Sequence, residues 1–213
     1  MSKVRASRQI FYNVFSYFYD FFIKIHSGHN RDETRRYLVD SSRINDTKKG
    51  RVLDICCGTG SVVLAFAEKY ADILAIGYDF SPGMLHKAKD KDVANKVILV
   101  NGDAARLSFT DDCFDVVCCS HALYELKGQM RTEALQEMKR VVKPAGQVLI
   151  MEHEVPKKFA IKIMFYIRML MMGPTDSWEF VKQGLSPFKK IFNDVTLSHT
   201  PSGKSKLIIC RKI

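Results

Sequence analysis

The feature that most constrains the fold is a regular alternation of short apolar runs with helical patterns from residue 51 onward. Apolar residues recur at helical spacing near 60–70, 82–93 and 129–142. The apolar runs between and around these segments are Arg51–Ile55, Ile73–Tyr78, Val97–Asn101, Phe114–Cys119 and Gln147–Glu152. Strands that alternate with helices are typical of βαβ units, in which the strands lie parallel. We therefore predict an α/β fold.

Two further apolar runs near the carboxyl end complete the predicted sheet. Val195–His199 and Lys206–Cys210 are separated by Thr200-Pro201-Ser202-Gly203, which favours a turn, so they predict an antiparallel hairpin. Lys143-Pro144-Ala145-Gly146 is expected to end the preceding helix and to turn the chain into the fifth strand. The expected architecture is a doubly wound, mainly parallel sheet of seven strands.

An aromatic helix is expected before the sheet. Its apolar stripe recurs at helical spacing and consists of Phe11, Phe15, Phe18, Phe22 and Ile25. Such a helix either packs on the main domain or forms a lid over a site at the strand ends. The predicted division is an N-terminal helical cap over 1–45 and a main domain over 46–213, with an inserted helix at about 157–172.

The charge of the chain is unevenly distributed. Lys and Arg number 33 against 23 Asp and Glu, a net charge of +10. Residues 1–50 carry 10 basic and 5 acidic residues, 51–154 carry 12 and 15, and 155–213 carry 11 and 3, or +5, −3 and +8. Basic flanks suit a nucleic acid, an anionic membrane surface or an acidic substrate, and they also serve solubility alone.

Glycines follow the first predicted strand, where a helix begins. Gly58-Thr59-Gly60 would let the backbone approach a ligand closely. The third small residue of a dinucleotide-binding turn would fall on Val63, which is bulky, and no Gly-Lys-Ser/Thr of a P-loop is present. Asp54 lies at the end of the same strand, where a carboxylate suits a ligand with a positive amine rather than a pyrophosphate.

Two more carboxylates follow the next two strands. Asp79 comes 19 residues after Gly60, where it could accept both hydroxyls of a ribose, and Asp103 could accept from the exocyclic amine of a purine. Singly, each Asp is more often a cap or turn residue. Together with Asp54 they converge on the carboxyl edge of the sheet, where open α/β sheets bind ligands.

These motifs together resemble the class I S-adenosylmethionine-dependent methyltransferases, over about residues 50–155. The resemblance implies the Rossmann-like methyltransferase fold and S-adenosylmethionine as cofactor. It implies that the glycine turn holds the methionine end, that Asp79 binds the ribose, and that Asp103 and Ala104 contact the adenine. It places three further residues beside the cofactor, namely Phe80 and Met84 at the ring and Ser120 after the fourth strand. The turn Arg140-Val141-Val142-Lys143-Pro144-Ala145-Gly146 resembles the family's Lys-Pro-Gly-Gly turn.

The opening segment narrows the expected acceptor. Phe11-x-x-Val14, Tyr19-Asp20 and Gly28-His29 resemble the start of the ubiquinone/menaquinone biosynthesis C-methyltransferases, and Tyr19 could close over the cofactor. Met151-Glu152-His153-Glu154-Val155-Pro156 resembles the acidic, Pro-ended fifth strand of that family. The same spacing fits relatives that methylate phospholipid headgroups. The implied acceptor is a lipophilic small molecule, foremost a quinone precursor.

Residues 157–172 form an apolar helical pattern with basic side chains. Lys157, Lys158, Lys162 and Arg168 fall within about 140° of arc on a helical wheel. Such a helix can lie at an anionic membrane surface, or it can be a core helix of the cap. No run is long and apolar enough to span a bilayer, and no secretory signal is evident. We therefore expect a cytoplasmic chain with peripheral contact at the inner face of the membrane.

Removal of a proton would assist methylation of a quinol carbon or a phenolic oxygen. The candidate bases are His121 and His153, after strands four and five, and each could equally be structural. The adjacent pairs Cys56–Cys57 and Cys118–Cys119 could approach one another, but their spacing favours buried apolar thiols over a metal site.

Several other functions stay open at this point. A phospholipid or small-amine N-methyltransferase would share the same donor site. A non-catalytic S-adenosylmethionine-binding subunit that activates a partner would keep the same aspartates. Nucleic-acid methylation is disfavoured, because strand four ends in Cys118-Cys119-Ser120-His121 and not in an Asn/Asp-Pro-Pro-aromatic motif.

Overall fold

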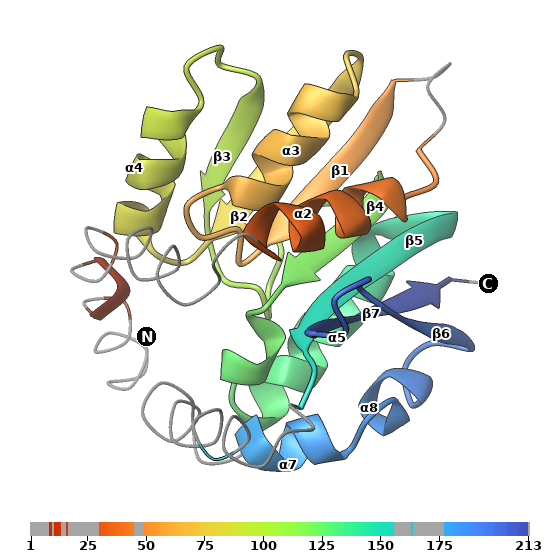
Figure 1. Ribbon diagram of the computed structural model, residues 1–213. Helices are drawn as coiled ribbons and strands as arrows, with labels where there is room; N and C mark the ends of the chain where they lie inside the picture. The colour runs from red at the N-terminus through yellow and green to blue at the C-terminus, as the bar shows by residue number, and fades with distance from the viewer. Residues whose placement is uncertain are drawn as a thin grey trace.

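The computed structural model describes residues 9, 11–13, 16, 30–44, 49–155, 163 and 177–212. Its centre is one seven-stranded sheet (Figure 1). The strands are β1 (Gly50–Ile55), β2 (Ile73–Asp79), β3 (Val97–Asn101), β4 (Phe114–Ser120), β5 (Val142–His153), β6 (Asp194–His199) and β7 (Ser205–Arg211). The helices are α2 (Asn30–Asp40), α3 (Ser61–Lys69), α4 (Pro82–Lys91), η1 (Leu123–Glu125), α5 (Gly128–Val141), α7 (Ser177–Lys182) and α8 (Ser186–Lys189).

The strand order is β3-β2-β1-β4-β5-β7-β6, and the first five strands in this order are parallel. β7 is antiparallel to both β5 and β6. The predicted doubly wound, mainly parallel sheet with a terminal hairpin is therefore confirmed. The order reverses between β1 and β4, which is the position where open α/β sheets bind ligands.

Helices cover both faces of the sheet. On one face, Leu38 of α2 and Phe66 of α3 are fully buried against Val52, Val116 and other apolar strand residues. On the opposite face, α5 buries an apolar stripe that consists of Ala134, Leu135, Met138 and Val141. Apolar side chains removed from water on both faces stabilise such a layered fold.

β5 begins earlier than predicted. Phe114 pairs with Val142, and the next pair joins Val116 to Gln147, so residues 143–146 bulge out of the ladder instead of turning the chain before the strand. Ala145 has a left-handed φ of 63°. A Cβ at Gly146 would lie 2.9 Å from the Asp115 carbonyl oxygen, so this bulge has no room for a side chain there.

Much of the predicted cap falls outside the described residues, including Phe15, Phe18, Phe22 and Ile25 of the aromatic stripe. The same holds for the basic segment 157–172, except for Ile163. The division at 45/46 and the lid therefore stay predictions. Among the described residues, no helix combines the length and apolar character that a bilayer span requires.

Candidate active site

The glycine turn between β1 and α3 has three residues in the left-handed region: Cys56 at φ 56°, Gly58 at 54° and Gly60 at 76°. A Cβ on Gly60 would lie 2.9 Å from the Cβ of Ala88, so this glycine lets α3 pack closely on α4. A Cβ on Gly58 would meet nothing within 4 Å. Gly60 thus allows α3 and α4 to pack together, whereas the backbone of Gly58 is exposed on the open side of the turn.

Asp79 at the end of β2 is tied to this turn. One carboxylate oxygen accepts from the Gly58 N–H at 2.9 Å and the other from the Ser81 N–H at 2.9 Å. The side chain is buried, and burial raises its pKa to about 6 despite these hydrogen bonds. The Phe80 N–H also donates to this carboxylate. One lone pair of Asp79 is then left to accept from a hydroxyl group of a ligand.

Asp54 lies beneath the turn. Its carboxylate accepts from the Val63 N–H at 3.2 Å and from the Cys118 thiol at 3.5 Å, and only 1% of the residue is exposed. Burial raises the pKa of Asp54 to about 7. Its observed partners all belong to the protein, so it supports the turn from below.

The other predicted cofactor residues lie along the same edge of the sheet. Ala104 and Met84 are buried, and Phe80 is partly buried. Asp103 accepts from the Ala105 N–H at 3.1 Å, and Thr59 accepts from the Lys91 ammonium at 2.7 Å. Tyr19 lies outside the described residues.

Described residues of the opening segment contact this edge at two places. Near β2, the Asn13 side-chain oxygen accepts from the Ser81 hydroxyl at 2.8 Å and from the Gly83 N–H at 3.0 Å. Near β4, the Tyr12 hydroxyl donates to Glu125, and its ring packs edge-on against Phe80 with 5.6 Å between ring centroids. The segment therefore links the loops after β2 and β4. Sequence reasoning missed Tyr12 and Asn13, because nothing in their local pattern signals such distant partners.

Ser120, His121 and His153 come together where β4 and β5 end. Nδ1 of His121 lies 3.1 Å from the Ser120 hydroxyl, and Nε2 lies 3.1 Å from the Ser205 hydroxyl. The centroid of the His121 ring is 4.3 Å from that of His153. Both nitrogens of His121 thus have hydroxyl neighbours, an arrangement that fixes the ring in place.

Glu152, beside His153 in the sequence, was not among the predicted site residues. It is 4% exposed, and its buried Oε1 atom has no hydrogen-bond partner within the described part of the chain. Burial raises its pKa to about 8. The signal that could have found it is the one that found Asp54 and Asp79, a single carboxylate at the end of a buried apolar run.

The cysteine pairs divide between the two faces of the sheet, as alternation along a strand requires. Cys118 packs with the core under α2 and α3, and Cys119 packs on the opposite face, where it interacts with Cys56. Burial raises the pKa of Cys57 and Cys118 well above the ordinary value, so both are neutral thiols. Within the part of the chain that the structure describes, no group of three or more His, Cys, Asp or Glu side chains could hold a metal ion.

Comparison with known proteins shows the family of the chain. A family model described as a methyltransferase domain matches residues 52–146. The demethylmenaquinone methyltransferase of Bacillus licheniformis is 30% identical over 182 residues, which cover 84% of this chain and 78% of that protein. The Bacillus subtilis demethylmenaquinone methyltransferase is 31% identical over 168 residues, covering 76% and 71%. The chain belongs to the methyltransferase family that includes these enzymes. It is an S-adenosylmethionine-dependent methyltransferase.

Solved structures agree with the fold of this methyltransferase. A chain from the complex between the Haloferax volcanii Trm112 methyltransferase activator and a methyltransferase superposes with a TM-score of 0.71 at 14% identity, covering 94% of this chain and 96% of that one. A Pyrococcus horikoshii protein gives 0.66 at 19% identity, covering 90% and 94%. At such identities the likeness concerns the fold alone.

Proposed function

We propose that this methyltransferase transfers a methyl group to a quinone precursor in its reduced, hydroxyl-bearing form. The observation that carries the proposal is the relationship to demethylmenaquinone methyltransferases across 84% of the chain. The aromatic and apolar residues that line the approach support it, because Tyr12 and Phe80 pack together beside the cofactor edge. A planar, apolar acceptor suits such a surface.

The proposed cofactor site follows the glycine turn and the two strands beside it. Gly58, Thr59 and Gly60 would hold the methionine end, and Asp54 would act by supporting the turn from beneath. Asp79 would accept from the ribose with the lone pair that the Gly58, Ser81 and Phe80 N–H groups leave available. When bound, S-adenosylmethionine supplies an electrophilic methyl group.

The remaining predicted residues complete this site. Phe80 and Met84 would flank the adenine, with Asp103 and Ala104 at its edge and Ser120 beside the sulfur end. The open space at Gly58 supports this placement, since a ligand can approach the backbone there without a clash. Tyr19 is proposed to close over the cofactor.

The opening segment is proposed to be a lid. Tyr12 and Asn13 already link the loops after β2 and β4, between which the cofactor would lie. A lid that orders over bound cofactor excludes water and positions the acceptor, and positioning supplies much of the rate of a methyl transfer.

His121 and His153 are proposed to position the acceptor more than to remove its proton. His121 has hydroxyl neighbours at both ring nitrogens, and the His153 ring lies against it at a tilt of 47°. Their rings form a fixed wall where β4 and β5 end.

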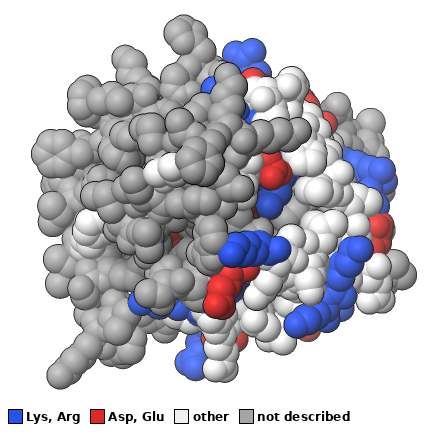
Figure 2. All heavy atoms as spheres, turned by 60° about the horizontal axis from the view of Figure 1, so that its bottom comes forward, with Lys and Arg blue, Asp and Glu red and all other residues white. Residues whose placement is uncertain are grey.

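Contact with an anionic membrane is the proposed means of reaching a lipophilic acceptor. The net charge of +8 over residues 155–213 supports it. On the face of Figure 2, the described Lys and Arg side chains are interspersed with Asp and Glu and form no continuous basic patch. The basic segment 157–172 is therefore the proposed contact.

The test is a transfer assay with methyl-labelled S-adenosylmethionine and two acceptors, a short-chain demethylated naphthoquinol kept reduced and phospholipid vesicles. We expect label in the quinol, with one added methyl on a ring carbon by mass spectrometry. Label in the phospholipid would assign the headgroup activity instead. Donor binding without any transfer would overturn the proposal. The variant Asp79→Ala should lose transfer, and Asp111→Ala, an exposed carboxylate remote from the edge, should retain it.

A further inference from the structure

Glu152 is a buried carboxylate with fewer hydrogen bonds than its two oxygens can accept. It ends the apolar part of β5 at the edge where the proposed site lies, and its Oε1 atom has no hydrogen-bond partner among the residues that the structure describes. A buried polar atom without a partner lowers stability. Such an atom is a candidate for contact with a ligand.

The neighbours of Glu152 do not neutralise it. The Tyr124 N–H donates to its carboxylate. Lys206 of β7 and Arg131 of α5 favour the charged form, whereas Glu125 opposes it. Burial outweighs these effects, and the pKa rises to about 8.

Lys206 lies opposite Glu152 in the β5–β7 ladder, and no ion pair between them is found among the described residues. Arg131, the second cation that acts on Glu152, is directed elsewhere. Its guanidinium donates to the carbonyl oxygens of Leu123 at 3.1 Å and Tyr124 at 3.3 Å, and it stacks on the Phe180 ring at 4.1 Å. These contacts join α5 to η1 and to α7. Within the described chain, the hydrogen bond to the Glu152 carboxylate comes from Tyr124, and the buried Oε1 atom has no donor there.

We propose that Glu152 accepts the hydroxyl proton of the methyl acceptor. This inference rests on the proposed function, because a reduced quinone carries a phenolic hydroxyl beside the ring carbon to be methylated. A carboxylate can accept that hydrogen bond with Oε1, while Tyr124 keeps the other oxygen in place. His121 and His153, whose ring centroids are 4.3 Å apart where β4 and β5 end, orient the acceptor and do not deprotonate it.

The chemistry balances with one proton released. The hydroxyl proton moves to Glu152 as the ring carbon forms its bond to the methyl group, and the carbon–sulfur electron pair stays on sulfur. The ring carbon then gives its own proton to water, and Glu152 returns its proton to the oxygen. A phenol has a pKa near 10, so a carboxyl group with a pKa of about 8 is a far better matched base than an ordinary one near 4.

The first arm of the test compares pH profiles of methyl transfer to the short-chain quinol. For the unmodified chain, kcat/KM should rise with pH to a midpoint near the pKa of about 8. Glu152→Gln should lose about 100-fold at high pH together with this rise, with S-adenosylmethionine affinity unchanged within about 3-fold. The matched control is Glu154→Gln, a partly exposed carboxylate two residues on that pairs with His199. It should keep both the rate and the profile.

The second arm needs no turnover. Calorimetry in buffers of different ionisation enthalpy would measure protons released when 2-naphthol binds at pH 7, with 2-methoxynaphthalene as the ligand that has no hydroxyl. We expect release from the unmodified chain with 2-naphthol only, and none from Glu152→Gln.

The two arms separate the two proposals. Quinol methylation with an unchanged profile in Glu152→Gln would overturn the role of Glu152 and leave the proposed function standing. Absence of quinol methylation, with Glu152-dependent proton release on 2-naphthol binding, would overturn the proposed function and retain Glu152 as a hydroxyl acceptor. Absence of both would overturn both.

Discussion

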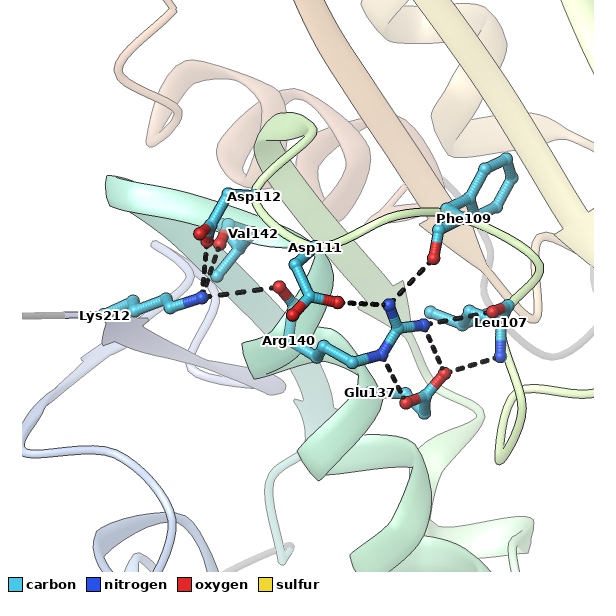
Figure 3. A network of polar contacts seen from close by, with 8 residues as sticks. All are labelled: Leu107, Phe109, Asp111, Asp112, Glu137, Arg140, Val142 and Lys212. Carbon is cyan, nitrogen blue, oxygen red and sulfur yellow. Dashed lines mark hydrogen bonds and ion pairs between the residues drawn. The ribbon is translucent and has the colours of Figure 1, made fainter.

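Carboxylates at the two edges of the sheet have opposite environments. At the edge where β4 and β5 begin, Arg140 near the end of α5 makes five hydrogen bonds (Figure 3). They run to both carboxylate oxygens of Glu137, to Asp111, and to the carbonyl oxygens of Leu107 and Phe109. Every N–H of the guanidinium is thereby used, and the ion pair lowers the pKa of Glu137.

At the carboxyl edge, three carboxylates are buried, and none of them has a cationic hydrogen-bond partner among the described residues. Within that part of the chain, Asp54 and Asp79 accept from backbone N–H groups and a thiol, and one oxygen of Glu152 has no donor. Burial raises the pKa of all three, to about 7, 6 and 8. The same residue type is thus held charged at one edge and driven toward the neutral form at the other.

This difference in pairing distinguishes charged groups that stabilise the fold from carboxylates that are available to a ligand. The Arg140 network fastens the loop that leads from Asp103 to β4, so its value lies in stability. The carboxyl-edge acids cost stability, because a buried, unpaired carboxylate is unfavourable. Such a cost is typical of functional sites, where perturbed pKa values gather.

The largest expected effect comes from Asp79→Ala. It should weaken S-adenosylmethionine binding by 100-fold or more, on the order of 3 kcal/mol, because it removes both the proposed ribose contact and the anchor of the Gly58 N–H. Titration calorimetry measures the change. The matched variant at the other edge is Asp111→Ala, which should leave affinity within about 2-fold. Equal affinity for Asp79→Ala and the unmodified chain would refute the ribose assignment.

Arg140→Met should have the next largest effect, this time on stability. We expect the free energy of unfolding to fall by about 2 kcal/mol, since Glu137 and two carbonyl oxygens lose their charged donor. Denaturant titration measures the free energy of unfolding. The control is Arg140→Lys, which keeps the positive charge but loses the planar guanidinium and its five donors. If Arg140→Met weakened donor binding more than it lowered stability, the proposed separation between the two edges would be wrong.

The fold was predictable because its signals are local. Apolar runs, helical spacing and turn residues each act within a few positions, and together they predicted seven strands with only the start of β5 misplaced. That error has a physical reason. Residues 143–146 look like a turn, but the pairing of Phe114 with Val142 starts the strand before them.

The candidate site was predictable only in part. Asp79 and Asp54 stand out because each ends a buried run. Their separate environments, one tied to the turn and one beneath it, depend on Val63, Cys118 and Ser81, which only the folded chain brings together. The partners of Tyr12 and Asn13 lie more than 60 residues away in sequence, at separations of 113 and 68, so no local pattern could reveal them.

The raised pKa values predict how stability depends on pH. Because the folded chain holds protons on Asp54, Asp79 and Glu152 that the unfolded chain releases near pH 4, stability should fall as pH rises from about 5 to 8. Glu152→Gln should reduce that fall, with most of the difference between pH 5 and 8. Denaturant midpoints across this range measure it. Glu137 acts in the opposite direction, since its lowered pKa adds stability that is lost in acid. A Glu152→Gln curve parallel to that of the unmodified chain would show that the carboxyl group is not held neutral.

The smallest expected effect distinguishes binding from backbone strain at two glycines. Gly58 and Gly203 both have left-handed φ values, 54° and 66°, and a Cβ on either would meet nothing within 4 Å. Substitution by Ala should therefore lower the free energy of unfolding by a similar amount, about 1 kcal/mol. Only Gly58→Ala should also weaken S-adenosylmethionine binding, by about 10-fold, because the added methyl group stands on the open side of the turn where the cofactor would approach. Thermal unfolding and titration calorimetry on the two variants measure both quantities. Equal donor affinity in the two variants would mean that the open side of Gly58 faces away from the cofactor, and Asp79 would then contact the cofactor from the β2 side of the turn alone.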